Sequence, residues 1–87
     1  MRYRISADVL SAPLAGETVL LDMRSRSYFR LNATAACTWE ALERGRSLDE
    51  LLEDLEQRFA APREVIETEI RELLASMCDR GLIAESA

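Results

Sequence analysis

The reactive side chains of this 87-residue chain are few, and their spacing matches no familiar catalytic or metal-binding pattern. Histidine, the commonest general base and a frequent metal ligand, does not occur. Cys37 and Cys78 lie far apart, and neither has the neighbouring Cys or His that completes a zinc site or activates a thiol. The sequence therefore predicts structural thiols, no catalytic residues, no metal and no cofactor.

The remaining chemical candidates have simpler structural explanations. Residues 50–56 are rich in acids but lack the aspartate-rich loop of a calcium site, so we expect a solvated helix surface. Trp39 belongs to a residue type that dominates binding hot spots, yet its neighbours Ala35 and Leu42 favour packing in the core. These side chains give no evidence for an enzyme.

The formal net charge is −5, from 16 acidic and 11 basic residues, and it is unevenly distributed. Residues 1–30 carry five Arg and three acids (+2), whereas residues 47–80 carry four Arg and ten acids (−6). An acidic chain argues against a nucleic-acid-binding protein, which normally presents a basic face. No apolar run is long enough to span a membrane, and the N-terminus lacks a signal-peptide hydrophobic region. We therefore expect a single cytoplasmic domain over residues 1–87 that binds no membrane.

The first third of the chain has the pattern of strands separated by turns. Residues 3–9 alternate between apolar and polar side chains, the period of a half-buried strand, and residues 11–17 contain the Pro and Gly of a turn. Residues 18–23 and 27–31 follow as two further strands at hairpin distance. We expect a three-stranded antiparallel meander.

Three helices are predicted after the strands. Asn32 is placed to cap a helix that runs to about residue 44, and Ser47 and Glu50 form a capping box at the start of the second. The third helix begins near Pro62 and ends before Gly81. The predicted fold class is α+β, an N-terminal three-stranded sheet followed by three helices. It is winged-helix-like, although here the sheet precedes the helices.

The third strand is predicted to lie at an edge of the sheet, where its outward backbone groups have no partner strand. Arg26 and Arg30 flank this edge. Their charge is a common device against unwanted pairing, and that is the simpler interpretation. The same edge is open to β-augmentation, in which an incoming peptide adds a strand.

The third helix carries a second set of side chains beside its predicted inner stripe, which is Ile66, Ile70, Leu73 and Met77. This second set recurs at three and four residues and consists of Glu67, Arg71, Leu74 and Cys78. Apolar Leu74 and Cys78 are unexpected on an exposed face unless something covers them. The pattern alone is more typical of an ordinary surface, and a peptide groove between strand and helix is the alternative.

The order of several short motifs resembles the PqqD-like family. Residues 16–22 (Gly-Glu-Thr-Val-Leu-Leu-Asp) are followed by residues 27–36 (Ser-Tyr-Phe-Arg-Leu-Asn-Ala-Thr-Ala-Ala) and then by Trp39 and Leu42. Residues 81–83 (Gly-Leu-Ile) fit the family's closing motif. The resemblance spans roughly residues 5–83, and no single motif in it is catalytic.

This resemblance implies a recognition element for the leader segment of a ribosomally made, post-translationally modified peptide. In the family the leader adds to the third strand and rests against the third helix. Carried onto this chain, the contacting strand comprises Arg26, Ser27, Tyr28, Phe29, Arg30 and Leu31. The helix wall, assigned from helical-face geometry, comprises Glu67, Ile70, Arg71, Leu74, Ala75 and Cys78.

A stand-alone domain of this size is similar to two subgroups of the family. One delivers a peptide to a radical-SAM enzyme. The other presents the leader to a cysteine protease upstream of a cyclase in lasso-peptide biosynthesis. We favour this second subgroup, because every basic residue is Arg and Ala is abundant, a composition typical of the GC-rich genomes of bacteria that make lasso peptides. A winged-helix DNA-binding regulator is the alternative from another class, although residues 63–80 carry three Arg against five acids.

Overall fold

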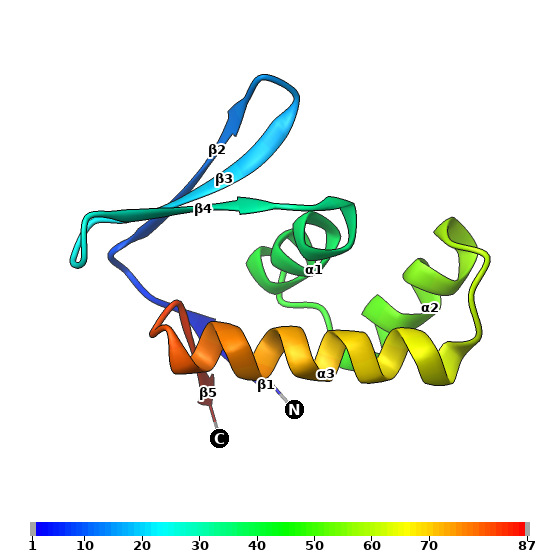
Figure 1. Cartoon of the computed structure of the whole chain (residues 1–87). Helices are drawn as coiled ribbons and strands as arrows, with labels where there is room; N and C mark the ends of the chain where they lie inside the picture. Colours follow the sequence, from blue (N-terminus) through cyan, green and yellow to red (C-terminus); the bar gives the residue numbers. More distant parts are fainter. Residues whose placement is uncertain (1, 87) are drawn as a thin grey trace.

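The structure, a computed structural model, describes residues 2–86 and contains a three-stranded antiparallel meander, as predicted, but with a different first strand. Its strands β2 (Val9–Leu14), β3 (Glu17–Asp22) and β4 (Ser27–Leu31) are antiparallel in the order β2-β3-β4. The β2–β3 hairpin projects away from the helices, and β4 runs toward α1 (Figure 1). The α+β class and the edge position of β4 are confirmed.

Three helices follow the sheet, as predicted: α1 (Ala33–Glu43), α2 (Leu48–Arg58) and α3 (Arg63–Asp79). The Asn32 side chain accepts a hydrogen bond from the Ala35 N–H (2.8 Å), which satisfies one of the unpaired donors at the start of α1. Ser47 and Glu50 form the expected reciprocal capping box. Gly45 follows α1 with a φ of 69°, a conformation that costs glycine little.

The first predicted strand is wrong in its extent. Residues 3–9 do not form one strand, because the chain turns between β1 (Arg2–Ile5) and β2. β1 is not part of the meander. It pairs antiparallel with β5 (Ile83–Ser86), a strand that the sequence did not predict. The first and last strands, β1 and β5, therefore form a separate two-stranded sheet.

The turn predicted over residues 11–17 is shorter, because Pro13 lies inside β2. The Met23 N–H donates to the Asp8 carbonyl (2.9 Å). Because hydrogen-bonded pairs alternate along an antiparallel ladder, the backbone N–H and C=O groups of the even-numbered residues of β2 point toward β3. Pro13 therefore faces the open side of an edge strand, where its missing N–H removes no ladder bond. Ala15 and Gly16 alone make the hairpin turn, with φ values of 53° and 81°.

The core lies between the inner face of the sheet and the three helices. Its fully buried side chains are Leu20, Thr38, Trp39, Leu52, Leu55 and Ile70. Trp39 is 2% exposed, which confirms its predicted place in the core, and its indole Nε1 has no hydrogen-bond partner among residues 2–86. Leu82 and Ile83, which follow α3, are buried in this core. Within residues 2–86, no helix combines the length and the apolar character that crossing a bilayer requires.

Candidate functional site

A groove of about 530 Å³ lies between β4 and the C-terminal half of α3. Its lining is mainly apolar and contains no Asp or Glu; it consists of Tyr28, Phe29, Arg30, Leu31, Asn32, Ala35, Leu73, Ser76, Met77, Arg80 and Leu82. The floor is formed by buried Met77 and Leu82, while Phe29 and Leu73 are half-buried at the walls. The groove therefore combines a strand edge with an apolar helix flank.

The open edge of β4 carries backbone groups that are free to pair with an added strand. β4 is the last strand in its sheet, so one edge has no partner strand among residues 2–86. The Met23–Asp8 hydrogen bond fixes the alternation of the ladder. In β3, the backbone N–H and C=O groups of odd-numbered residues point toward β2, and those of even-numbered residues point toward β4. By this alternation the N–H and C=O groups of Tyr28 and Arg30 face the open edge.

Arg30 is held on the outer face of the sheet by a cross-strand partner. Its Nε donates to Glu17 Oε2 at 2.8 Å, and this hydrogen bond is the main reason why the pKa of Arg30 is raised. The pair is exposed, so it contributes little to stability. At the preceding turn, Arg26 has a φ of 60° and ends the loop that leads into β4. The two arginines flank the edge as the sequence predicted.

The groove wall on α3 is joined to β4 by one aromatic contact. The Arg80 guanidinium carbon lies 5.1 Å from the centroid of the Phe29 ring, within the range of a cation–π interaction. Arg80 is the C-cap of α3, so this contact fixes the end of the helix against the middle of the strand. Phe29, one of the predicted contact residues, is thus part of the groove.

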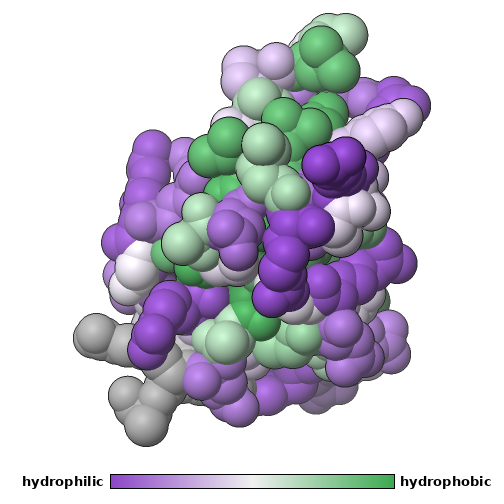
Figure 2. Space-filling model, turned by 90° about the vertical axis from the view of Figure 1, so that its left-hand side faces the viewer, coloured by the Kyte–Doolittle hydropathy of each residue, from purple (hydrophilic) through white to green (hydrophobic). Residues whose placement is uncertain are grey.

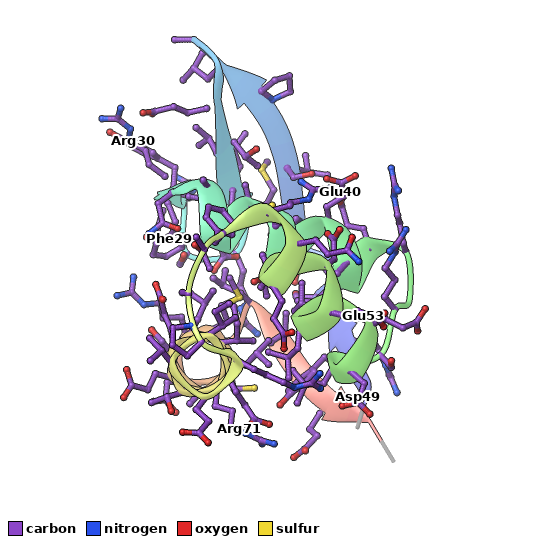
Figure 3. The ribbon with its side chains drawn as sticks, turned by 90° about the vertical axis from the view of Figure 1, so that its right-hand side faces the viewer. Phe29, Arg30, Glu40, Asp49, Glu53 and Arg71 are labelled. Carbon is purple, nitrogen blue, oxygen red and sulfur yellow. The ribbon has the colours of Figure 1, made fainter. Side chains whose placement is uncertain are left out.

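The predicted helix wall does not line this groove. Ile70 and Leu74 are buried in the core, with 0% and 3% exposure. The other four predicted residues, Glu67, Arg71, Ala75 and Cys78, are absent from the lining. Figure 3 looks along α3 and shows Arg71 on the side of the helix away from Phe29. The predicted wall therefore lies on the core face and the opposite flank.

That opposite flank faces the β1–β5 sheet. The pKa of Tyr3 is raised by burial, with further increments from Glu85 and Cys78. Burial is also the main cause of the raised pKa of the Cys78 thiol, which therefore stays protonated at neutral pH. Leu74 and Cys78 are covered by the chain itself, which explains their apolar character.

Sequence reasoning missed the helix residues that do line the groove, which are Leu73, Ser76, Met77 and Arg80. The sequence pattern places Leu73 and Met77 on the inner stripe and identifies Arg80 only as one of the charges of residues 63–80. Their only signal is their place on one flank of the stripe, and local periodicity does not distinguish this flank from the other.

An apolar row crosses the outer face of the sheet. Cross-strand neighbours Leu10, Leu21 and Tyr28 are aligned by the register, with exposures of 55%, 38% and 67%. Apolar side chains gather over the projecting hairpin in Figure 2. Large exposed apolar patches commonly mark interaction surfaces, and this row ends at the open edge of β4.

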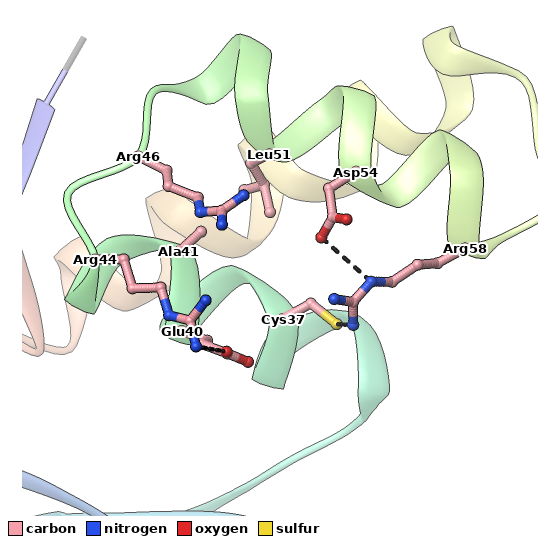
Figure 4. A pocket seen from close by; sticks show the side chains of 8 residues that line it. All are labelled: Cys37, Glu40, Ala41, Arg44, Arg46, Leu51, Asp54 and Arg58. Atoms are coloured by element: carbon pink, nitrogen blue, oxygen red, sulfur yellow. Dashed lines mark hydrogen bonds and ion pairs between the residues drawn. The ribbon is translucent and has the colours of Figure 1, made fainter.

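A second, polar pocket of about 70 Å³ lies between α1 and α2 (Figure 4). Two of its arginines are already paired, Arg44 with Glu40 (2.8 Å) and Arg58 with Asp54 (3.2 Å). Arg58 also reaches the Cys37 sulfur at 3.4 Å. Acids elsewhere on α2, such as Glu53, point outward (Figure 3), and residues 2–86 contain no cluster of His, Cys, Asp and Glu suited to a metal ion.

The fold and the groove together define a small α+β domain in which an open sheet edge lies beside an apolar helix flank. The sequence matches the family model of coenzyme PQQ synthesis protein D (PqqD) over residues 17–83. The chain therefore belongs to the PqqD family, and the expected resemblance is confirmed. No curated protein sequence matches the chain.

Two solved structures are similar over almost their whole length. One, described as TbiB1 in complex with the TbiA(beta) leader peptide, is 29% identical; the match covers 100% of this chain and 99% of that one, with a TM-score of 0.88. The other, described as lasso peptide synthetase B1 complexed with the leader peptide, is 27% identical; the match covers 98% of this chain and 100% of that one, with a TM-score of 0.87.

Proposed function

We propose that this protein binds the leader segment of a ribosomally made precursor peptide, without catalysing a reaction itself. The observation that carries the proposal is the open edge of β4 beside the apolar flank of α3, in a chain whose structural neighbours are described as leader-peptide complexes. An extended peptide that pairs with the Tyr28 and Arg30 backbone adds a fourth strand to the sheet. Its alternate side chains then enter the groove.

The proposed contact surface combines a predicted part and a revised part. The strand contribution is residues 26–31, as the sequence predicted. On α3 we replace the predicted wall by Leu73, Ser76, Met77 and Arg80, because these residues face β4. Leader contacts by Glu67, Arg71, Ala75 and Cys78 would require the peptide to reach the other flank of the helix.

The energetics of this surface suit a reversible adaptor. Each added strand hydrogen bond contributes about 0.5–1.5 kcal/mol net. A fully buried leucine-sized side chain adds about 1.5–3 kcal/mol. Ordering a flexible leader costs about 2–5 kcal/mol, so affinities between micromolar and nanomolar are expected. A complex of this strength holds the precursor while still allowing its release.

We further propose that the bound leader is delivered in the cytoplasm to a separate modifying enzyme, with the cysteine leader protease of lasso-peptide biosynthesis favoured over a radical-SAM enzyme. The structural neighbour described as lasso peptide synthetase B1 supports the lasso assignment. The row of Leu10, Leu21 and Tyr28 provides an apolar surface for that enzyme, continuous with the strand that the leader would add. Binding both partners raises the local concentration of the core peptide at the enzyme.

Leader binding is tested by searching the genes that flank this one for a short precursor reading frame and titrating a fluorescently labelled synthetic copy of its leader. Saturable binding at micromolar concentration or tighter is expected, with a scrambled peptide as the control. Absence of binding at millimolar protein would contradict the proposal. Delivery is tested by adding the neighbouring protease: Leu21→Ser should slow leader cleavage while leader affinity stays within about twofold.

A DNA-binding role finds little support in α3. Both arginines within α3 form ion pairs, Arg63 with Asp49 (3.3 Å) and Arg71 with Glu67 (3.2 Å). The helix as a whole remains acidic, whereas nucleic-acid contact requires unpaired basic side chains. A salt-dependent mobility shift of duplex DNA by the pure protein would revive that alternative.

A further inference from the structure

Two arginines line the groove, and only one of them has a charge partner. Arg30 is paired with Glu17 across the sheet. Arg80 has no ion pair and no side-chain hydrogen bond among residues 2–86, and its one side-chain interaction is the contact with Phe29. Because no Asp or Glu lines the groove, Arg80 supplies it with an unbalanced positive charge.

The contact with Phe29 holds the guanidinium of Arg80 without using its hydrogen-bond donors. The guanidinium carbon lies over the Phe29 ring, and no hydrogen bond within residues 2–86 uses the side-chain N–H donors of Arg80. Arg80 is exposed, so these donors are accessible from the groove. A guanidinium held in this way loses little conformational freedom when a planar carboxylate pairs with it.

We infer that Arg80 selects leaders by charge, so that the groove takes a segment in which an Asp or Glu lies beside an apolar side chain. The apolar side chain packs against Phe29, Leu73 and Met77, and the carboxylate accepts hydrogen bonds from Arg80. This inference rests on the proposed function and specifies its ligand. Since the chain as a whole carries a charge of −5, an acidic peptide gains favourable contacts only at a few basic positions, and this fixes its register.

The test compares two charge reversals on opposite flanks of α3. Arg80→Glu and Arg71→Glu change the net charge equally, but Arg71 pairs with Glu67 (3.2 Å) and lies outside the groove. The probes are fluorescein-labelled synthetic peptides, the TbiA(beta) leader and the leader of any precursor reading frame found among the flanking genes, followed by anisotropy at low and high salt. Arg80→Gln should weaken binding about tenfold and Arg80→Glu further, whereas Arg71→Glu should stay within about twofold. The differences should shrink as salt is added.

Complementary changes in the peptide separate recognition from a folding defect. A leader with Asp and Glu replaced by Asn and Gln should bind the unaltered protein about tenfold more weakly. A leader in which Lys replaces the acidic residue that pairs with Arg80 should bind the Arg80→Glu variant better than it binds the unaltered protein. Equal binding of the acidic and amide peptides would overturn the inference, as would equal losses for the Arg80 and Arg71 reversals. Either result would leave leader binding intact. Failure of the unaltered protein to bind the acidic leader at all would overturn the proposed function together with this inference.

Discussion

Leu73 and Leu74 are neighbours in the chain but belong to different surfaces of the protein. Leu74 is 3% exposed in the core, on the side of α3 that leads to the β1–β5 sheet, whereas Leu73 is half-buried and lines the groove beside β4. The step of about 100° between successive helical residues is enough to separate them. This pair decides which flank of α3 is available to a bound peptide.

Leu73→Glu should weaken leader binding about tenfold, because it removes part of an apolar contact and places a charge in the groove. Ala75→Glu is the matched control, since Ala75 is exposed and outside the groove lining. Calorimetric titration of both variants measures the effect, and thermal melts check that both fold. A loss confined to Ala75→Glu would restore the helix wall that the sequence predicted.

Amide hydrogen exchange should reveal strand addition at β4. In the free protein the Phe29 amide pairs with β3 and should exchange slowly, whereas the Tyr28 and Arg30 amides face the open edge and should exchange fast. Saturation with leader should slow Tyr28 and Arg30 at least tenfold and leave Phe29 nearly unchanged. Unaltered exchange at Tyr28 and Arg30 in the saturated complex would rule out pairing at this edge.

Asp22 should make the stability of the protein depend on pH. Its carboxylate accepts hydrogen bonds from the Ser25 hydroxyl (2.9 Å) and the Arg24 N–H (3.1 Å), and the Ser25 bond is the main cause of a pKa below the ordinary value of 3.8. A depressed pKa stabilises the folded state at pH values above 3.8, and this contribution is lost as the pH falls through the lower folded-state pKa. Asp22→Asn should therefore lower the melting temperature by a few degrees at pH 7.

The same variant should differ less from the unaltered protein as the pH falls below 3.8. Asp8→Asn, an exposed aspartate in the turn before β2, is the control and should have little effect at either pH. A deficit of equal size at pH 7 and pH 3 would show that the carboxylate charge of Asp22 does not hold the turn that leads into β4.

Gly81→Ala should destabilise the protein by about 1–2 kcal/mol, because Gly81 has a φ of 74° that disfavours residues with a Cβ. An added Cβ would also lie 2.8 Å from Arg24 Nη2, in the turn before β4. Gly16→Ala has a similar φ of 81° with nothing within 4 Å, so it measures the backbone cost alone. Chemical denaturation should show a larger loss for Gly81→Ala, and Arg24→Ala should remove the excess. Equal losses of stability in both glycine variants would show that the Arg24 side chain moves aside at no measurable cost.

The elements whose signals are local follow from the amino-acid sequence alone. Strand β4, the three helices, the Asn32 cap and the Ser47–Glu50 capping box all follow from side chains within a few residues of one another. The edge position of β4 also followed, because consecutive strands joined by short turns pair in order. These features were sufficient to predict an open edge as a candidate binding site.

The pairing of β1 with β5 and the flank of α3 that faces β4 depend on long-range packing. The first joins strands from opposite ends of the chain, and no local pattern marks such a partner. The second depends on how the helix is rotated and packed: periodicity identifies the stripe that contains Ile70, but both flanks of that stripe look alike from the sequence. Packing against the sheet turned Leu73 and Arg80 toward Phe29 and left Arg71 on the far side.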